Sequence, residues 1–237
     1  MDINGKTALI TGGSSGIGRM VAEELCRSGA NVIVASRRPQ SKDDGRLITN
    51  ILRCRYMQVD FGNLAQVRDL AAQCGEIDIL VNNVGTFYLD KALHSYQFDE
   101  VLEHITVNLI SHVLITKLLI KPDDQKPNVV ICVSSVAGAV TGSHGDTLYG
   151  VAKAGLVGFV RSLALEYSPW MRAVAICPGF VDTKLITEPL PPEILEASVP
   201  LKRIGKPAEI ARLISHVVDN DFINGASLVI DGGEACV

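Results

Sequence analysis

The sequence predicts a doubly wound α/β fold, in which a seven-stranded, mostly parallel sheet carries helices on both faces. Two observations lead to this prediction. Most of the apolar runs are continuous rather than alternating, which is typical of strands that are covered on both faces. These runs also alternate along the chain with helical segments, and repeated strand–helix–strand units build a parallel sheet.

Seven short runs rich in β-branched and apolar residues predict the strands. In chain order they are KTALI at 6–10, NVIVAS at 31–36, RYMQV at 55–59, IDILVN at 77–82, NVVICVSS at 128–135, RAVAIC at 172–177 and ASLVID at 226–231. The segments between these runs predict the helices, at 16–28, 41–52, 64–74, 98–119, 149–167 and 207–218.

The organisation of the chain indicates one domain over residues 1–237, because no internal repeat, low-complexity tract or long linker divides it. The segment 183–206 is rich in proline and apolar residues and lies between two predicted strands. We expect it to leave the sheet and to cover a site, as long loops often do. Its apolar residues would form either a pocket wall or the packing of a lid; they are Leu185, Ile186, Leu190 and Leu195.

The composition is that of an ordinary globular protein, which at this length needs no metal or disulfide to fold. The net charge of −4 gives no electrostatic reason to expect nucleic acid or an anionic membrane as a partner. The N-terminus lacks the basic start of a signal peptide, and no continuous apolar run reaches the ~18 residues of a membrane span. The six cysteines form no C-x-x-C pair, so we expect reduced thiols in a cytoplasmic protein.

A glycine-rich turn follows the first predicted strand directly, in TGGSSGIG at 11–18. Without Cβ atoms, Gly12, Gly16 and Gly18 allow backbone N–H groups to approach a phosphate closely. The helix that begins near Gly16 then directs its positive N-terminal end at a pyrophosphate. The alternative is a tight turn with nothing bound, and the strand before it and the helix after it favour the binding site.

The spacing G-x-x-x-G-x-G resembles the cofactor loop of the short-chain dehydrogenase/reductase family. Further motifs follow in the family's order: NNVG at 82–85, VNLIS at 107–111, SSVAG at 134–138, YGVAK at 149–153, CPGFVDT at 177–183 and IDGG at 230–233. The resemblance covers nearly the whole chain. It implies a Rossmann-like, nicotinamide-dependent oxidoreductase.

The end of the second predicted strand bears on which nicotinamide cofactor is bound. Many dinucleotide folds place an acid there, which binds the ribose hydroxyls and disfavours a 2′-phosphate. This chain has Ser36, Arg37 and Arg38 instead, and an arginine fork with a hydroxyl suits a phosphate. We therefore predict NADP(H) rather than NAD(H), with Arg37 as the main contact; the alternative is a pair of solvated loop arginines.

The resemblance also implies the remaining cofactor contacts. Asp60, with Phe61 beside it, matches the family position near adenine, and Asn82 and Gly85 match the loop beside the adenosine ribose. The other matching positions lie in the glycine loop and in CPGFVDT; they are Ser14, Ser15, Ile17, Pro178, Gly179, Val181 and Thr183.

The stretch LYGVAKAG places Tyr149 and Lys153 four positions apart, on one face of a predicted helix. Tyrosine, with a pKa of ~10, is a reluctant acid at neutral pH, and a nearby ammonium lowers that pKa. The resemblance makes Tyr149 the general acid or base, Lys153 its tuner and a ribose contact, Ser135 a donor to the substrate oxygen, and Asn108 the residue that organises a relay water. The bare Y-x-x-x-K pattern is also common on helix surfaces.

The interval from Ser135 to Tyr149 is one residue longer than is common in the family. We interpret this as an insertion between them, with Ser135 retained and Ser134 as the fallback. The inserted loop carries Ser143, His144 and Asp146, which we expect to be solvated, although contact with substrate is the alternative.

The sequence therefore predicts an NADP(H)-dependent oxidoreductase acting on a small-molecule ketone or secondary alcohol, possibly a 3-oxoacyl thioester because the C-terminal stretch is similar to that branch. One alternative is an NAD(H)-linked dehydrogenase that oxidises a sugar, diol or sterol. Another is a non-catalytic NADP(H)-sensing protein. The apolar helices 98–119 and 149–167 pair between subunits in relatives, which implies a homodimer or homotetramer.

Overall fold

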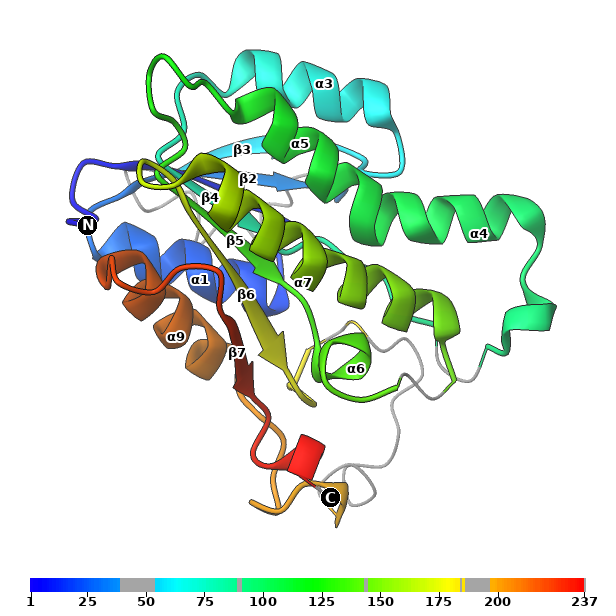
Figure 1. Ribbon diagram of the computed structural model, residues 1–237. Coiled ribbons are helices and arrows are strands. Elements are labelled where there is room, and N and C mark those ends of the chain that lie inside the picture. Colours follow the sequence, from blue (N-terminus) through cyan, green and yellow to red (C-terminus); the bar gives the residue numbers. More distant parts are fainter. Residues whose placement is uncertain (39–53, 89–90, 143–144, 184, 186–196, 237) are drawn as a thin grey trace.

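A seven-stranded parallel sheet forms the centre of the computed structural model, which describes residues 1–38, 54–88, 91–142, 145–183, 185 and 197–236 (Figure 1). The strand order is β3-β2-β1-β4-β5-β6-β7, and every neighbouring pair is parallel. The strands are β1 Thr7–Thr11, β2 Asn31–Ser36, β3 Cys54–Gln58, β4 Ile79–Asn82, β5 Val129–Val133, β6 Arg172–Pro178 and β7 Ser227–Ile230. The predicted fold class is confirmed.

Helices cover both faces of this sheet (Figure 1). The helices are α1 Gly16–Arg27, α3 Leu64–Gln73, α4 Phe98–Ile105, α5 Ser111–Leu119, α6 Val136–Ala139, α7 Thr147–Tyr167 and α9 Pro207–Asp219. There are also two short 3-10 helices, η1 Leu93–Ser95 and η3 Glu234–Cys236. The helix predicted at 41–52 lies outside the described residues.

The sheet separates two hydrophobic cores. Alternate strand residues such as Ala8 and Ile10 pack with α1 and α9 on one face. Their neighbours, such as Leu9, pack with α3, α5 and α7 on the other face. Because both faces are buried, both positions of the two-residue strand repeat must be apolar, which explains the continuous apolar runs.

The helical span 98–119 is continuous along the chain but changes its winding. A π-helical turn, η2 Thr106–Ile110, joins α4 to α5. Single π turns inside helices are rare overall, and those that occur are often found at functional sites. This one contains Asn108, a predicted site residue, whereas the sequence indicated an ordinary helix.

Two helical spans, Phe98–Leu119 and Thr147–Glu166, are long and apolar enough to cross a membrane by length and composition alone. A core helix of a soluble protein passes the same test, and over half of the second span, 56%, is buried inside the protein. A search for unbroken apolar runs does not detect these spans, because each span contains scattered polar residues. The mean hydropathy of each span is nevertheless high.

Candidate active site at the carboxyl edge of the sheet

The glycine loop between β1 and α1 approaches its surroundings too closely for side chains. Gly12 has a φ of +67°, and a Cβ there would lie 2.9 Å from the Cα atom of Val84. A Cβ on Gly18 would lie 2.5 Å from Asn83 Nδ2 and 2.6 Å from the carbonyl oxygen of Gly12. The glycines therefore let the loop fold tightly against the segment after β4, with its backbone turned toward the carboxyl edge of the sheet.

The N-terminus of α1 remains available to an anion. Ser15 is its N-cap residue and makes no capping hydrogen bond, and the first turn carries no acid. A Cβ on Gly16 would lie 3.2 Å from the Cγ2 atom of Thr183, so the segment after β6 reaches this turn. Ile17 packs partly against the core beneath. Free N–H groups and the helix dipole together suit a phosphate.

Asn83, which was not among the predicted site residues, braces the glycine loop. Its Nδ2 donates to the carbonyl oxygens of Thr11, at 2.9 Å, and Gly12, at 3.3 Å. The predicted residue, Asn82, is fully buried, and its Nδ2 donates instead to Thr116 Oγ1 at 2.9 Å. A cofactor contact of Asn82 would therefore have to come from its backbone. The strand alternation could have indicated this, because successive residues face opposite ways.

The end of β2 lies beside the glycine loop, since the hydroxyls of Ser14 and Ser36 are 2.6 Å apart. The side chains of Arg37 and Arg38 are exposed. The carbonyl oxygen of Arg37 accepts a hydrogen bond from Gln58 Nε2 at 3.3 Å, which anchors its backbone and leaves the guanidinium free to reach a ligand.

The predicted adenine-side residues differ in exposure. Asp60 is partly exposed, and its Oδ1 accepts from the N–H of Gly62 at 3.0 Å. Phe61 is 2% exposed and belongs to the core under α3, so its side chain cannot reach a ligand in this arrangement.

Tyr149, Ser135 and Lys153 lie together at the carboxyl end of β5. Tyr149 is in the first turn of α7 and is 8% exposed, and its ring meets the Phe87 ring in a T-shaped contact with centroids 5.1 Å apart. The Nζ atom of Lys153 lies 5.3 Å from the centre of the Tyr149 ring. Lys153 is buried, and its Nζ donates to the carbonyl oxygen of Val133 at 2.8 Å.

Burial controls the ionisation of both groups. Burial raises the pKa of Tyr149 to about 12; the Ser135 hydroxyl lowers it and the Asp146 carboxylate raises it further. Burial lowers the pKa of Lys153 to about 8. The predicted lowering of the Tyr149 pKa by Lys153 is not found in this arrangement, because the ammonium is held at the Val133 carbonyl and desolvation of the phenolate dominates.

The hydrogen bonds of Ser134 and Ser135 distinguish these two candidates for the donor to the substrate oxygen. Ser134 is buried, and its hydroxyl donates to the carbonyl oxygen of Lys153 at 2.8 Å. Ser135 caps α6, where its Oγ accepts from the N–H of Ala137 at 3.2 Å, and it stands close enough to Tyr149 to affect its pKa. The geometry favours Ser135 over the fallback, Ser134.

Asn108 is buried at the same place, and its amide is held from both sides. Its Oδ1 accepts from the N–H of Thr86 at 3.0 Å, and its Nδ2 donates to the carbonyl oxygen of His104 at 3.0 Å. A Cβ on Gly85 would lie 3.0 Å from Asn108 Oδ1 and 3.7 Å from Lys153 Nζ. Gly85 therefore lies where Asn108 and Lys153 converge.

The segment after β6 forms another wall. Pro178 ends the strand, and its carbonyl oxygen lies 3.5 Å from Ser135 Oγ. A Cβ on Gly179 would lie 2.3 Å from Glu234 Oε2, an atom that also accepts from the N–H of Phe180 at 2.9 Å. No local sequence pattern indicates this role of Glu234, because the contact joins residues 54 positions apart.

This wall continues toward the segment 183–206. Val181 pairs with Gly205 in an isolated bridge. Of the apolar residues predicted to form a pocket wall or a lid, Leu185 is 37% exposed. Ile186, Leu190 and Leu195 lie outside the described residues.

The burial of Asp146 contradicts the prediction that it is solvated. The sequence placed it in a solvated loop, but it is 1% exposed and is the N-cap residue of α7, where its Oδ1 accepts from the N–H of Tyr149 at 3.0 Å. The physical reason is the helix terminus, whose free N–H groups favour a carboxylate. Ser143 and His144 lie outside the described residues.

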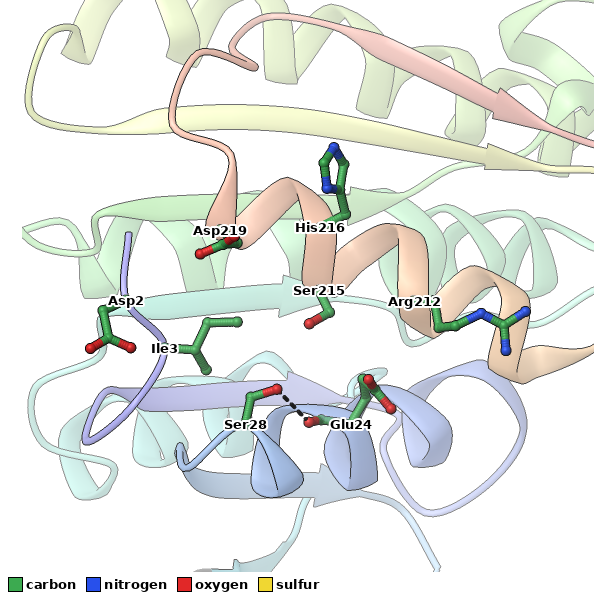
Figure 2. A pocket seen from close by; sticks show the side chains of 8 residues that line it. All are labelled: Asp2, Ile3, Glu24, Ser28, Arg212, Ser215, His216 and Asp219. Carbon is green, nitrogen blue, oxygen red and sulfur yellow. Dashed lines mark hydrogen bonds between the residues drawn. The ribbon is translucent and has the colours of Figure 1, made fainter.

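The part of the chain that the structure describes holds no group of His, Cys, Asp and Glu residues arranged for a metal ion. It does contain an open hollow of about 480 Å³, shown in Figure 2, between the C-terminal ends of α1 and α9. Ser28, Ser215 and Asp219 are among its lining residues. This hollow lies at the amino edge of the sheet, away from Tyr149.

Comparisons with known proteins agree with this geometry. A family model described as enoyl-(acyl carrier protein) reductase matches residues 12–234. The chain is 34% identical to oxidoreductase UcpA of Salmonella typhimurium, covering 98% of this chain and 95% of that protein. It is also 34% identical to the 3-oxoacyl-[acyl-carrier-protein] reductase FabG of Chlamydia trachomatis, covering 97% of each. A solved short chain dehydrogenase from Burkholderia cenocepacia, in complex with NADP, superposes with a TM-score of 0.88 at 26% identity and covers 100% of both chains.

Proposed function

The chain belongs to the short-chain dehydrogenase/reductase family and is an oxidoreductase, and on that premise we propose that it transfers a hydride between NADP(H) and a ketone or secondary alcohol. The observation that carries this proposal is the placement of Tyr149 beside Ser135, Lys153 and Asn108. These groups meet at the carboxyl edge of the sheet, next to a glycine loop and a helix N-terminus that suit a pyrophosphate.

The residues present suit a dinucleotide. The glycine loop and the N-terminus of α1 would hold its phosphates, and Ser36 with Arg37 would hold a 2′-phosphate. Lys153 and the segment from Pro178 to Thr183 would hold the nicotinamide end. NADP(H) supplies or accepts the hydride when it is bound. The Burkholderia relative was solved with NADP, which supports this choice of cofactor.

Tyr149 is the proton donor in the reducing direction. Its raised pKa, about 12, keeps the phenol protonated at neutral pH, so that it can donate a proton to a carbonyl oxygen as negative charge develops there. Ser135 would donate a hydrogen bond to the same oxygen. Asn108 holds Thr86 and the carbonyl of His104 in place, and both hydrogens of its Nδ2 are donated there. It would therefore order a relay water beside Lys153 through an oxygen atom rather than through Nδ2.

The substrate that we propose first is a 3-oxoacyl thioester, because the Chlamydia relative carries that activity in its name. The test is NADPH consumption by the purified protein with a short 3-oxoacyl thioester, in wild type and in Tyr149→Phe. We expect turnover in wild type and a loss of about a hundredfold or more in the variant, with NADPH still bound.

Two results would change the proposal. Wild-type turnover only with other ketones would keep the chemistry and replace the substrate. NADPH binding without turnover on any ketone or alcohol would favour a cofactor-sensing protein instead.

We also propose a homodimer or homotetramer assembled through the layer of α4, η2 and α7. Large apolar side chains are exposed along this layer: Phe98, Leu102, Ile110 and Val151, between 41% and 76% exposed. Contiguous exposed apolar side chains on a helix layer are typical of a protein interface.

A further inference from the structure

The carboxylate of Asp146 gathers four polar groups from separate parts of the chain. Its Oδ1 accepts from the N–H of Tyr149 and from the hydroxyl of Tyr96, both at 3.0 Å. Its Oδ2 accepts from the N–H of Tyr88 at 3.2 Å and lies 3.3 Å from Nε2 of His104. Both partners of the last contact have fully buried side chains. A carboxylate so enclosed fixes the position of every element that it contacts.

His104 extends this cluster to the other end of the site. Its ring faces Asp146 at ion-pair distance, although the ring nitrogen is not aligned for a hydrogen bond. Its carbonyl oxygen accepts from Nδ2 of Asn108, in the π turn. The Tyr88 and Tyr96 rings flank the imidazole, with centroids 5.3 and 6.0 Å away. One buried pair therefore joins the start of α7 to the residue that lies beside Lys153.

We propose that Asp146, together with His104, is a positioning residue pair for the reaction: the carboxylate sets Tyr149 through the first turn of α7, and the histidine sets Asn108 through the π turn. This inference rests on the proposed function, because Tyr149 and Asn108 have to act in catalysis for their positions to matter. It goes beyond an ordinary helix cap, since a cap requires only the contact to the Tyr149 N–H.

The charge of Asp146 adds an electrostatic consequence. Burial acts to raise the pKa of Asp146, but the contacts to His104, to the Tyr149 N–H and to the Tyr88 N–H outweigh it, and the pKa lies below its ordinary value. The group is therefore an anion at neutral pH, and it raises the pKa of Tyr149. The other titratable groups around it are His104, Tyr88, Tyr96, and Lys91, which pairs with Glu100.

Asp146→Asn separates charge from position. Asparagine keeps one oxygen for Tyr149 and Tyr96, and its amide can donate to Nε2 of His104; only the Tyr88 N–H loses its acceptor. We expect kcat within about threefold of wild type, because most contacts remain. The basic limb of the pH profile for carbonyl reduction should move down by about half a pH unit or more, because removing the anion lowers the pKa of Tyr149.

Asp146→Ala removes all four contacts. We expect kcat to fall about tenfold to a hundredfold, because small displacements of reacting groups are costly. The KM for NADPH should not change, because the glycine loop is braced separately by Asn83. His104→Leu should lower kcat as Asp146→Ala does. His104→Gln should keep a higher kcat than His104→Leu, because glutamine retains a polar donor toward Asp146.

The matched control is Asn63→Ala. Asn63 is the N-cap residue of α3, and its side chain accepts from two backbone N–H groups, as Asp146 does from Tyr149 and Tyr88. A purely structural cap would make the two alanine variants alike: less stable, with wild-type kcat and pH profile once folded. That result for Asp146→Ala would overturn the proposal. If Asp146→Ala does not fold, an unshifted basic limb in Asp146→Asn overturns it.

A readout without turnover distinguishes failure of this proposal from failure of the proposed function. If wild type turns over no ketone and no secondary alcohol, the proposed function fails, and the ultraviolet titration of the Tyr149 phenolate still tests Asp146. Wild type and Asp146→Asn are each compared with the same protein carrying Tyr149→Phe. The difference between the two titrations isolates the signal of Tyr149 from those of the other tyrosines, of which the chain has five in all. A lower apparent pKa in Asp146→Asn supports the proposal, and an unchanged one overturns it.

Discussion

At the scale of single residues, burial sets the chemistry of this site more than charge pairing does. The charged form of a buried side chain loses its hydration, so burial raises the pKa of Tyr149 and lowers those of Lys153 and His112. His112 is the clearest case. Burial, and then the charge of Lys153, lower its pKa to about 3, although the hydrogen bond from its Nε2 to the carbonyl oxygen of Val84 acts the other way.

We predict that His112 makes the protein sensitive to acid. A histidine whose pKa is lower in the folded state than in the unfolded state binds its proton only on unfolding. Between about pH 6.5 and pH 3, this single group therefore reduces the free energy of unfolding by up to about 1.4 kcal/mol per pH unit as the pH falls. His112→Gln, which keeps a donor toward Val84, should flatten this dependence.

Urea unfolding at several pH values measures the effect of His112. The two proteins should diverge as the pH falls below 6.5, with the variant losing less of its stability. Parallel curves for wild type and His112→Gln would contradict the prediction.

We predict that Arg37→Ala lowers the affinity for NADPH about tenfold to a hundredfold and leaves the affinity for NADH nearly unchanged. The reason is that a guanidinium makes charge-assisted hydrogen bonds to a 2′-phosphate, which NADH lacks. Fluorescence titration with each cofactor measures both affinities. Arg68→Ala, on α3, is the control for a general loss of positive charge. Equal NADPH affinity in wild type and Arg37→Ala would instead favour the NAD(H)-linked alternative.

At the scale of elements, each turn at the carboxyl edge is held by a contact to a different element. Asn83, after β4, holds the glycine loop after β1. Glu234, in η3, holds the turn after β6. Asp146 holds α7 to the segment after β4. The strands bring these turns to one edge, and the side-chain contacts then set their relative positions.

We predict that Gly18→Ala weakens NADPH binding at least tenfold and also lowers stability. The added Cβ would meet the Gly12 carbonyl oxygen, which is backbone and cannot rotate away, so the glycine loop has to shift. Cofactor titration and urea unfolding measure the two effects. A variant with wild-type affinity and an unchanged unfolding midpoint would show that the loop is less tightly packed than we describe.

At the scale of the whole molecule, the sheet leaves an apolar helix layer exposed on one side. Helix α7 packs with α4 and β6, and the outer sides of α4, η2 and α7 still expose Phe98, Leu102 and Val151. The same apolar character lets these spans pass a length and composition test for membrane crossing. Burial between copies of the chain would remove this surface from water.

We predict that Phe98→Ser reduces the oligomeric state, as measured by light scattering after size-exclusion chromatography. Phe98 is 76% exposed on α4 and loses apolar burial only if a second copy covers it. Phe222→Ser is the matched control, because Phe222 is 97% exposed but lies between α9 and β7, the edge strand of the sheet, and not on α4, η2 or α7. Dissociation by Phe222→Ser alone would place the interface at β7 instead.

The sequence by itself determined the fold class of this protein and predicted its candidate site residues. Local patterns carry that information: the strands 129–133 and 172–178 are buried on both faces, so every position in them except Arg172, the first residue of the second strand, is apolar. The site residues Ser135, Tyr149 and Lys153 could be predicted because their motifs occur in a set order. The structure places them together, and their catalytic roles stay predictions.

Only the tertiary structure decided which polar groups are buried and what they contact. Asp146 was predicted to be a solvated residue of the inserted loop, yet it is buried, and its partners Tyr96 and His104 lie 50 and 42 positions away in the sequence. The π turn at Asn108 and the orientation of Asn82 likewise depend on packing against α5 and on the segment at Thr86. The physical reason is that local periodicity encodes burial within one element, whereas a buried polar group needs a partner that the fold brings from a distant part of the chain.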